Sequence, residues 1–133
     1  MAVGIGISPS GSWADVDRST WSCFYSDAIQ DYILDLFSID GVEVDPYDGA
    51  DFSGPQLDTL VTQLTASADT IQGYSPDWPF TSSTQIDAYT RACSASGITP
   101  LAPRDQALRT IRETIALAQK ARSLNHVLVF CGD

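Results

Sequence analysis

Cysteine and histidine are the residue types that could support nucleophilic catalysis or a zinc site in this chain. The sequence holds three cysteines, Cys23, Cys93 and Cys131, and one histidine, His126. Cys131 follows His126 by five positions along a predicted strand, where the two side chains point to opposite faces. The paired ligand spacing of structural zinc sites is absent. We interpret these residues as structural, and a pairing of His126 with Cys23 or Cys93 stays open.

Acidic residues form a second candidate site, in a segment rich in Asp, Pro and Gly between residues 43 and 54. Its carboxylates, Glu43, Asp45, Asp48 and Asp51, are the hard oxygen ligands that calcium prefers. Their spacing does not match that of an EF-hand loop. We therefore predict a surface turn without a metal, and a small enzyme or metal-dependent protein that uses residues 43–51 is the alternative.

Glycine motifs for phosphate binding are incomplete. Gly4 and Gly6 give a G-x-G without the third glycine of a dinucleotide fingerprint, and neither a P-loop nor a nucleophile elbow occurs. The sequence thus predicts no catalytic residue, no cofactor and no enzyme activity.

Three further acids, Asp27, Asp31 and Asp35, recur every four residues within a predicted helix. That spacing places them in one row away from the apolar face, where like charges repel. The row is either a functional surface or a solvated helix face. Trp78, in a loop interrupted by two prolines, is expected to fold back toward the core and is a candidate aromatic anchor for a partner.

The elements that must position these residues follow from hydrophobic periodicity. We predict one globular domain, residues 1–133, of the α/β (or α+β) class. Its small sheet contains the N- and C-terminal strands, Val3–Ile7 and Val127–Cys131, and Val42–Val44 is a further predicted strand. About three long helices, at residues 20–37, 54–72 and 104–123, are expected to pack on the sheet.

Charge is distributed unevenly along the chain, whose formal net charge is −10. Residues 1–90 hold fourteen acids and only Arg18 as a base, a balance of −13, whereas the remainder is +3. A field of this sign repels phosphate backbones and attracts a basic protein. With no apolar segment of membrane-spanning length and no disulfide pattern, we expect a cytoplasmic protein, a monomer or weak dimer, that binds neither nucleic acid nor membrane.

In size, acidity and lack of catalytic motifs, and in segments such as Asp45-Pro46-Tyr47-Asp48-Gly49 and Phe130-Cys131-Gly132-Asp133, the chain resembles bacterial toxin immunity proteins. The resemblance implies tight 1:1 inhibition of a cognate toxin with a basic surface. The candidate contact residues are acids and aromatics on two surfaces, with the loop ranked first: Asp45, Tyr47, Asp48, Asp51, Trp78, Asp27, Asp31 and Asp35. A structural subunit of a larger assembly is a third possibility.

Overall fold

The sheet joins the two terminal strands at its centre and adds one short strand at each edge. A computed structural model describes residues 3–24, 27–39 and 41–132, with the side chains of Cys23 and Asp27 outside that description. The strands are β1 (Gly4–Ser8), β2 (Ser22–Cys23), β3 (Ala50–Phe52) and β4 (Val127–Cys131), in the order β2-β1-β4-β3. Every neighbouring pair is antiparallel. The fold is therefore α+β, and the predicted pairing of the terminal strands in one sheet is confirmed.

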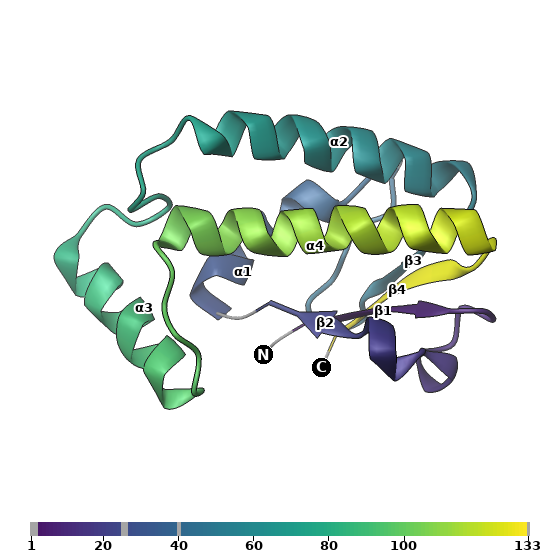
Figure 1. Ribbon diagram of the computed structural model, residues 1–133, viewed down its shortest axis with the longest axis horizontal. Coiled ribbons are helices and arrows are strands. Elements are labelled where there is room, and N and C mark those ends of the chain that lie inside the picture. Colours follow the sequence, from purple (N-terminus) through teal and green to yellow (C-terminus); the bar gives the residue numbers. More distant parts are fainter. Residues whose placement is uncertain (1–2, 25–26, 40, 133) are drawn as a thin grey trace.

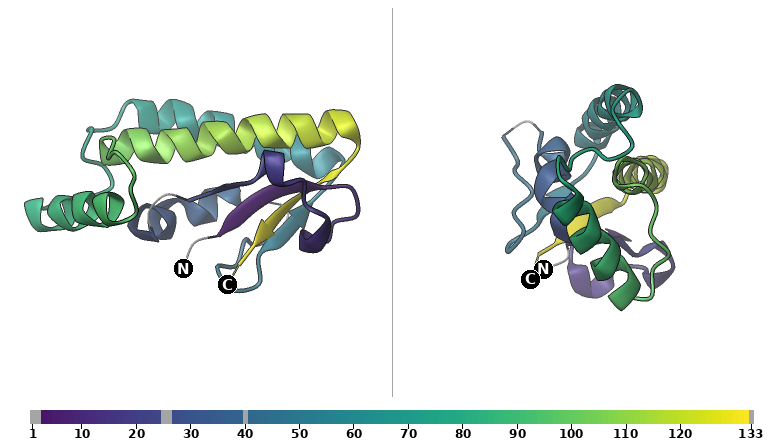
Figure 2. Two further views of the ribbon diagram at one scale, coloured as in Figure 1. Left: turned by 60° about the horizontal axis from the view of Figure 1, so that its bottom comes forward. Right: turned by 90° about the vertical axis from the view of Figure 1, so that its left-hand side faces the viewer.

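Two long helices cover one face of this sheet. They are α2 (Pro55–Gln72) and α4 (Pro103–Leu124), which run antiparallel to each other above the strands (Figure 1). Both agree with the predicted helices within one residue at each end. A third helix, α3 (Ser83–Ala95), lies to one side of this pair, beyond the turn that follows α2 (Figures 1 and 2).

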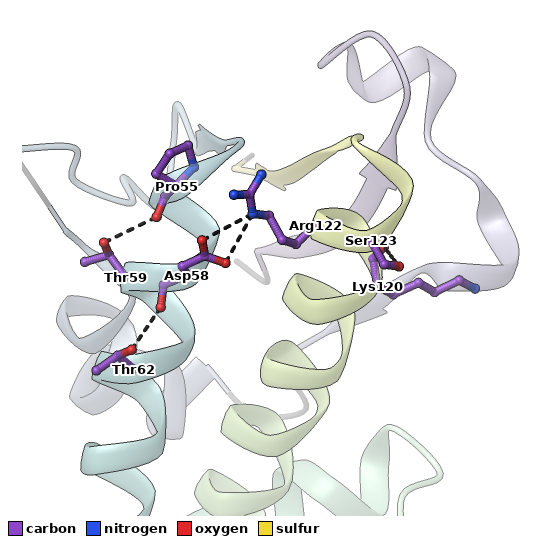
Figure 3. A network of polar contacts seen from close by, with 7 residues as sticks. All are labelled: Pro55, Asp58, Thr59, Thr62, Lys120, Arg122 and Ser123. Atoms are coloured by element: carbon purple, nitrogen blue, oxygen red, sulfur yellow. Dashed lines mark hydrogen bonds and ion pairs between the residues drawn. The ribbon is translucent and has the colours of Figure 1, made fainter.

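An ion pair joins the start of α2 to the end of α4. Arg122 Nε donates to both carboxylate oxygens of Asp58 at 3.2 Å (Figure 3). Beside it, the hydroxyls of Thr59 and Thr62 donate to backbone carbonyls one turn earlier in α2. Because both charged side chains are largely exposed, the contact adds little to the stability of the helix pair.

The core is a continuous apolar cluster between the helices and the sheet. Side chains on alternate positions of β1, including Ile5 and Ile7, enter it, whereas the residues between them face the other side. A series of edge-to-face phenylalanines links the layers, with ring centroids 5.3 to 5.7 Å apart, in the order Phe24, Phe37, Phe130 and Phe52. These rings hold the segment before β3 against the sheet.

The predicted helix at residues 20–37 is wrong in its first half. The chain there forms the 3₁₀ turn η2 (Arg18–Thr20) and strand β2, and helix α1 spans only Asp27–Ile33 before the 3₁₀ turn η3 (Leu34–Phe37). Trp21 supplied part of the helical periodicity, yet its side chain is 52% exposed. Pairing of Ser22 and Cys23 with β1 satisfies backbone groups that the helix would have used, so tertiary contacts override the local pattern.

The predicted strand at Val42–Val44 is also wrong. The segment makes an isolated bridge between Ile39 and Val42, and the Val44 N–H donates to the Ser38 hydroxyl. The strand is instead β3, within the segment predicted as a loop. It has three residues, too few for the alternation of Ala50 and Phe52 with outward Asp51 to stand out from the surrounding turn residues.

The length and apolar character of the helices decide whether any of them could cross a membrane. In the described ranges, no helix combines the length and the apolar character that crossing a bilayer requires. Even α4, the longest of them, carries seven charged side chains among its 22 residues.

Candidate functional site: an acidic turn with an exposed tyrosine

Residues 45–49 form a closed turn that leads into β3. The Gly49 N–H donates to the Asp45 carbonyl at 2.7 Å, which closes the turn. The Asp45 carboxylate accepts the N–H groups of Tyr47 at 2.7 Å and Asp48 at 3.1 Å. Asp45 thereby holds the turn in shape from within, as Asp side chains commonly do.

The end of β4 packs against this turn. A Cβ atom at Gly49, whose φ is +75°, would lie 1.9 Å from the Phe130 carbonyl oxygen. A Cβ atom at Gly132 would lie 2.5 Å from the Pro46 carbonyl oxygen. Two backbone segments far apart in the sequence therefore touch without intervening side chains. They are the segments on which the resemblance to immunity proteins was based, apart from Asp133, which lies outside the described residues.

Tyr47 projects from the turn into solvent. Its exposed fraction, 66%, is the largest among the large apolar side chains of the described residues. Asp45, Asp48 and Asp51 are exposed around it, and none of the three makes an ion pair with a described base. The turn thus presents an aromatic ring with uncompensated negative charge beside it.

Asp51 differs from the other acids of this segment in its surroundings. It lies on β3 opposite Val129, and the loop that contains Gly11 approaches its carboxylate. Desolvation in this position raises the pKa of Asp51 above 3.8. Its charge is therefore less favourable than that of a fully solvated carboxylate.

The arginines of α4 are engaged away from the turn. On α4, Arg109 pairs with Glu113 and Arg122 with Asp58, while Arg112 donates to the amide oxygen of Gln72. The two ion pairs neutralise one acid of α2 and one of α4, whereas the acids of the turn keep their negative charge. The charge asymmetry of the sequence therefore persists as a local negative field at the turn.

Trp78 lies apart from the turn. Its indole packs on Tyr74, with centroids 5.3 Å apart, and both rings line a shallow groove of about 360 Å³ with Tyr32, Leu36 and side chains of α2. Phe80, two residues later, is buried against Tyr32 and Tyr89. Trp78 itself is half-buried, so its predicted fold-back toward the core is partial.

The acidic helix row is only partly a row. Asp31 lies in α1 and Asp35 in the 3₁₀ turn that follows, so the four-residue helical spacing is interrupted between them. Both are exposed, and the side chain of Asp27 lies outside the described residues. Tyr32, between these acids in the sequence, is 50% exposed and lines the Trp78 groove. The row was ranked second because no aromatic residue was expected on its face, and Tyr32 corrects that expectation.

In the ranges that the structure describes, no three His, Cys, Asp or Glu side chains converge as metal ligands. Cys93 is a buried free thiol on α3, and Cys131 is a half-buried free thiol at the end of β4.

Sequence reasoning missed one concave site. Trp13, Arg18 and Trp21 line a hollow of about 620 Å³ beside β1. The available signal was the position of Arg18, the only base among the first 90 residues, between two tryptophans.

Comparison with protein families, with curated proteins and with solved structures finds no match for this chain.

Proposed function

We propose that the protein is an immunity protein, which neutralises a cognate bacterial toxin by direct 1:1 binding through the acidic turn. The partner is a protein with a basic surface. The inhibitor acts in the cytoplasm as a monomer or weak dimer, where its thiols stay reduced.

The observation that carries the proposal is the rigid display of Tyr47 beside unpaired carboxylates. A binding surface needs an aromatic anchor that is desolvated in the complex, because a few such residues supply most of the affinity. It also benefits from charges that steer the partner and fix its orientation. Tyr47 and Asp48 provide the two components on adjacent residues.

The rigidity of the turn adds to this argument. Ordering a flexible loop on binding costs free energy, and a loop that already holds its bound conformation avoids that cost. Here the Asp45 carboxylate and the close approach of Gly49 and Gly132 to neighbouring backbone hold the turn. Asp48 is the acid to substitute in a binding test, because its side chain makes no hydrogen bond within the turn. A substitution of Asp45 would remove the hydrogen bonds that hold the turn.

The groove around Trp78 is the second candidate surface for the same function. Its apolar lining and the acids Asp31 and Asp35 nearby in the sequence repeat the combination of aromatic and negative groups. In Figure 2 (right), α1 and the segment before β3 lie on the side of the molecule away from α4. One large partner could therefore contact both.

The test uses the protein encoded next to the gene for this chain, because toxins and their immunity proteins are expected to be encoded together. Co-expression should relieve growth inhibition by that protein, and titration calorimetry should give a 1:1 complex. Tyr47→Ala should weaken binding by about 2 kcal/mol or more, roughly thirtyfold, if the ring is the anchor.

Leu124→Ala provides the matched control, because Leu124 is also an exposed apolar side chain, at the end of α4. Its removal should leave the affinity unchanged. Absence of binding, or equal losses for the two variants, would contradict the proposal. Self-assembly of the isolated chain into large oligomers would instead favour a structural subunit.

A further inference from the structure

A hollow lies beside β1, on the face of the sheet that faces away from the core. Its walls are Trp13, Ala14, Val16, Arg18 and Trp21, from the segment that connects β1 to β2, and its volume of about 620 Å³ is typical of small-molecule sites. In Figure 1 this segment folds below the strands, whereas α2 and α4 lie above them. The hollow is therefore separate from the core and from the proposed binding turn.

Two glycines in β1 leave space for the side chains that line the hollow. A Cβ atom at Gly4 would lie 2.9 Å from Cη2 of Trp13 and 3.2 Å from Nε1 of Trp21. A Cβ atom at Gly6 would lie 2.4 Å from Cγ1 of Val16. Both indoles thus reach the strand because residue 4 is glycine, and Val16 reaches it because residue 6 is glycine.

The lining side chains offer hydrogen-bond donors and no acceptors. Indole and guanidinium groups donate only, and Ala14 and Val16 are apolar. Among the described residues, neither the Arg18 guanidinium nor the two indole N–H groups has a hydrogen-bond or ion-pair partner. Neither indole stacks on another ring of the described residues.

The acids that flank Arg18 in the sequence are already engaged. The Asp17 carboxylate accepts both the hydroxyl and the N–H of Ser19, and these bonds, helped by the charge of Lys120, lower the pKa of Asp17. Asp15 accepts the hydroxyl of Ser10. The Arg18 guanidinium is thus left available for an added anion.

We propose that this hollow binds a small molecule that joins a planar aromatic ring to a single carboxylate. The aromatic ring packs against the indoles, and the carboxylate accepts hydrogen bonds from Arg18 and an indole N–H. A single negative charge is favoured because one guanidinium faces it, whereas the balance of −13 over residues 1–90 repels polyanions.

The three tryptophan indole N–H signals in an NMR spectrum provide a direct test. Trp13, Trp21 and Trp78 are the only tryptophans of the chain, and single Trp→Phe variants assign them. Titration with 2-naphthoate should shift the Trp13 and Trp21 signals saturably and leave that of Trp78 in place. The neutral isostere 2-naphthamide should bind about tenfold or more weakly, because it lacks the charge-assisted hydrogen bond.

A charge-matched pair of variants assigns the anion contact. Arg18→Gln should weaken 2-naphthoate binding about tenfold and leave 2-naphthamide binding unchanged. Arg91→Gln, which removes an exposed base on α3, should change neither. Equal binding of the two naphthalene ligands, an equal shift at Trp78, or no saturable shift would overturn the proposal. Tighter binding of AMP, which carries two charges, would overturn the monocarboxylate class.

Discussion

Gln106 allows a test of the core that is independent of function. It lies on α4 with an exposed fraction of 0%, and in the described part of the chain neither its amide nitrogen nor its amide oxygen has a hydrogen-bond partner. A buried amide without partners costs about 1–3 kcal/mol of stability. Gln106→Met removes both polar atoms and keeps the unbranched shape and the helix propensity. We expect the variant to be more stable by about 1–3 kcal/mol.

Urea unfolding measures this change directly. The midpoint should rise while the slope stays constant, because the surface exposed on unfolding is nearly unchanged. For a domain of this size the melting temperature should rise by roughly 4 °C for each kcal/mol.

Gln30→Met is the matched control. Gln30 is also buried, at 2% exposure, but its side-chain oxygen accepts the Val3 N–H at 2.8 Å. The same substitution there leaves that N–H without its partner, so stability should fall by about 1–3 kcal/mol. The reasoning fails if the two variants change stability in the same direction, or if Gln106→Met is neutral.

Three further substitutions test local features by urea unfolding. Gly49→Ala should cost more than about 2 kcal/mol because its Cβ would overlap the Phe130 carbonyl, whereas Gly97→Ala, also at positive φ but in open space, should cost about 1 kcal/mol; equal losses would contradict the packing of the turn. Desolvation raises the pKa of Asp51 in the folded state, so its ionisation opposes folding above that pKa; Asp51→Asn should add up to about 0.5 kcal/mol at pH 7, and the gain should vanish below pH 3.8, the ordinary aspartate pKa, where the carboxyl is protonated in both states. Tyr89→Phe, which loses a 2.8 Å bond to a backbone carbonyl, should cost about 1 kcal/mol, and an unchanged midpoint would count against that bond.

Long periodic segments were predictable from the sequence. The helices α2 and α4 bury a stripe of residues such as Leu57, Leu60, Leu64 and Ile111 at helical spacing, and turn or proline residues mark their ends. The apolar run of β4 was recognisable because a central strand is covered on both faces. In these segments local pattern and tertiary burial agree.

Short elements were not predictable, because pairing with distant residues decides them. The two residues of β2 form a strand only through their contact with β1, and the three residues of β3 only through β4. Trp21 has helical spacing relative to its neighbours, yet its side chain is half exposed and lines the hollow beside β1.

The residue types of the candidate site could be predicted from the sequence, whereas their arrangement in space could not. The acids and Tyr47 of the turn were identified from residue types typical of a surface loop. The structural role of Asp45 depends on hydrogen bonds to the backbone two and three residues later. The position of Trp78 depends on its packing against Tyr74, so the sequence could not separate Trp78 from the turn.

The turn at residues 45–51 is proposed as the surface that binds a basic partner. Its most direct test is the association rate of the Asp48→Lys variant with the gene-neighbour protein, measured by stopped flow at low and at high salt. The control is Asp87→Lys, which makes the same charge change at an exposed position on α3, away from the turn (Figure 2). We predict that Asp48→Lys slows association several-fold more than the control at low salt, and that the difference shrinks at high salt as screening increases. Equal rates for the two variants at low salt would contradict the claim.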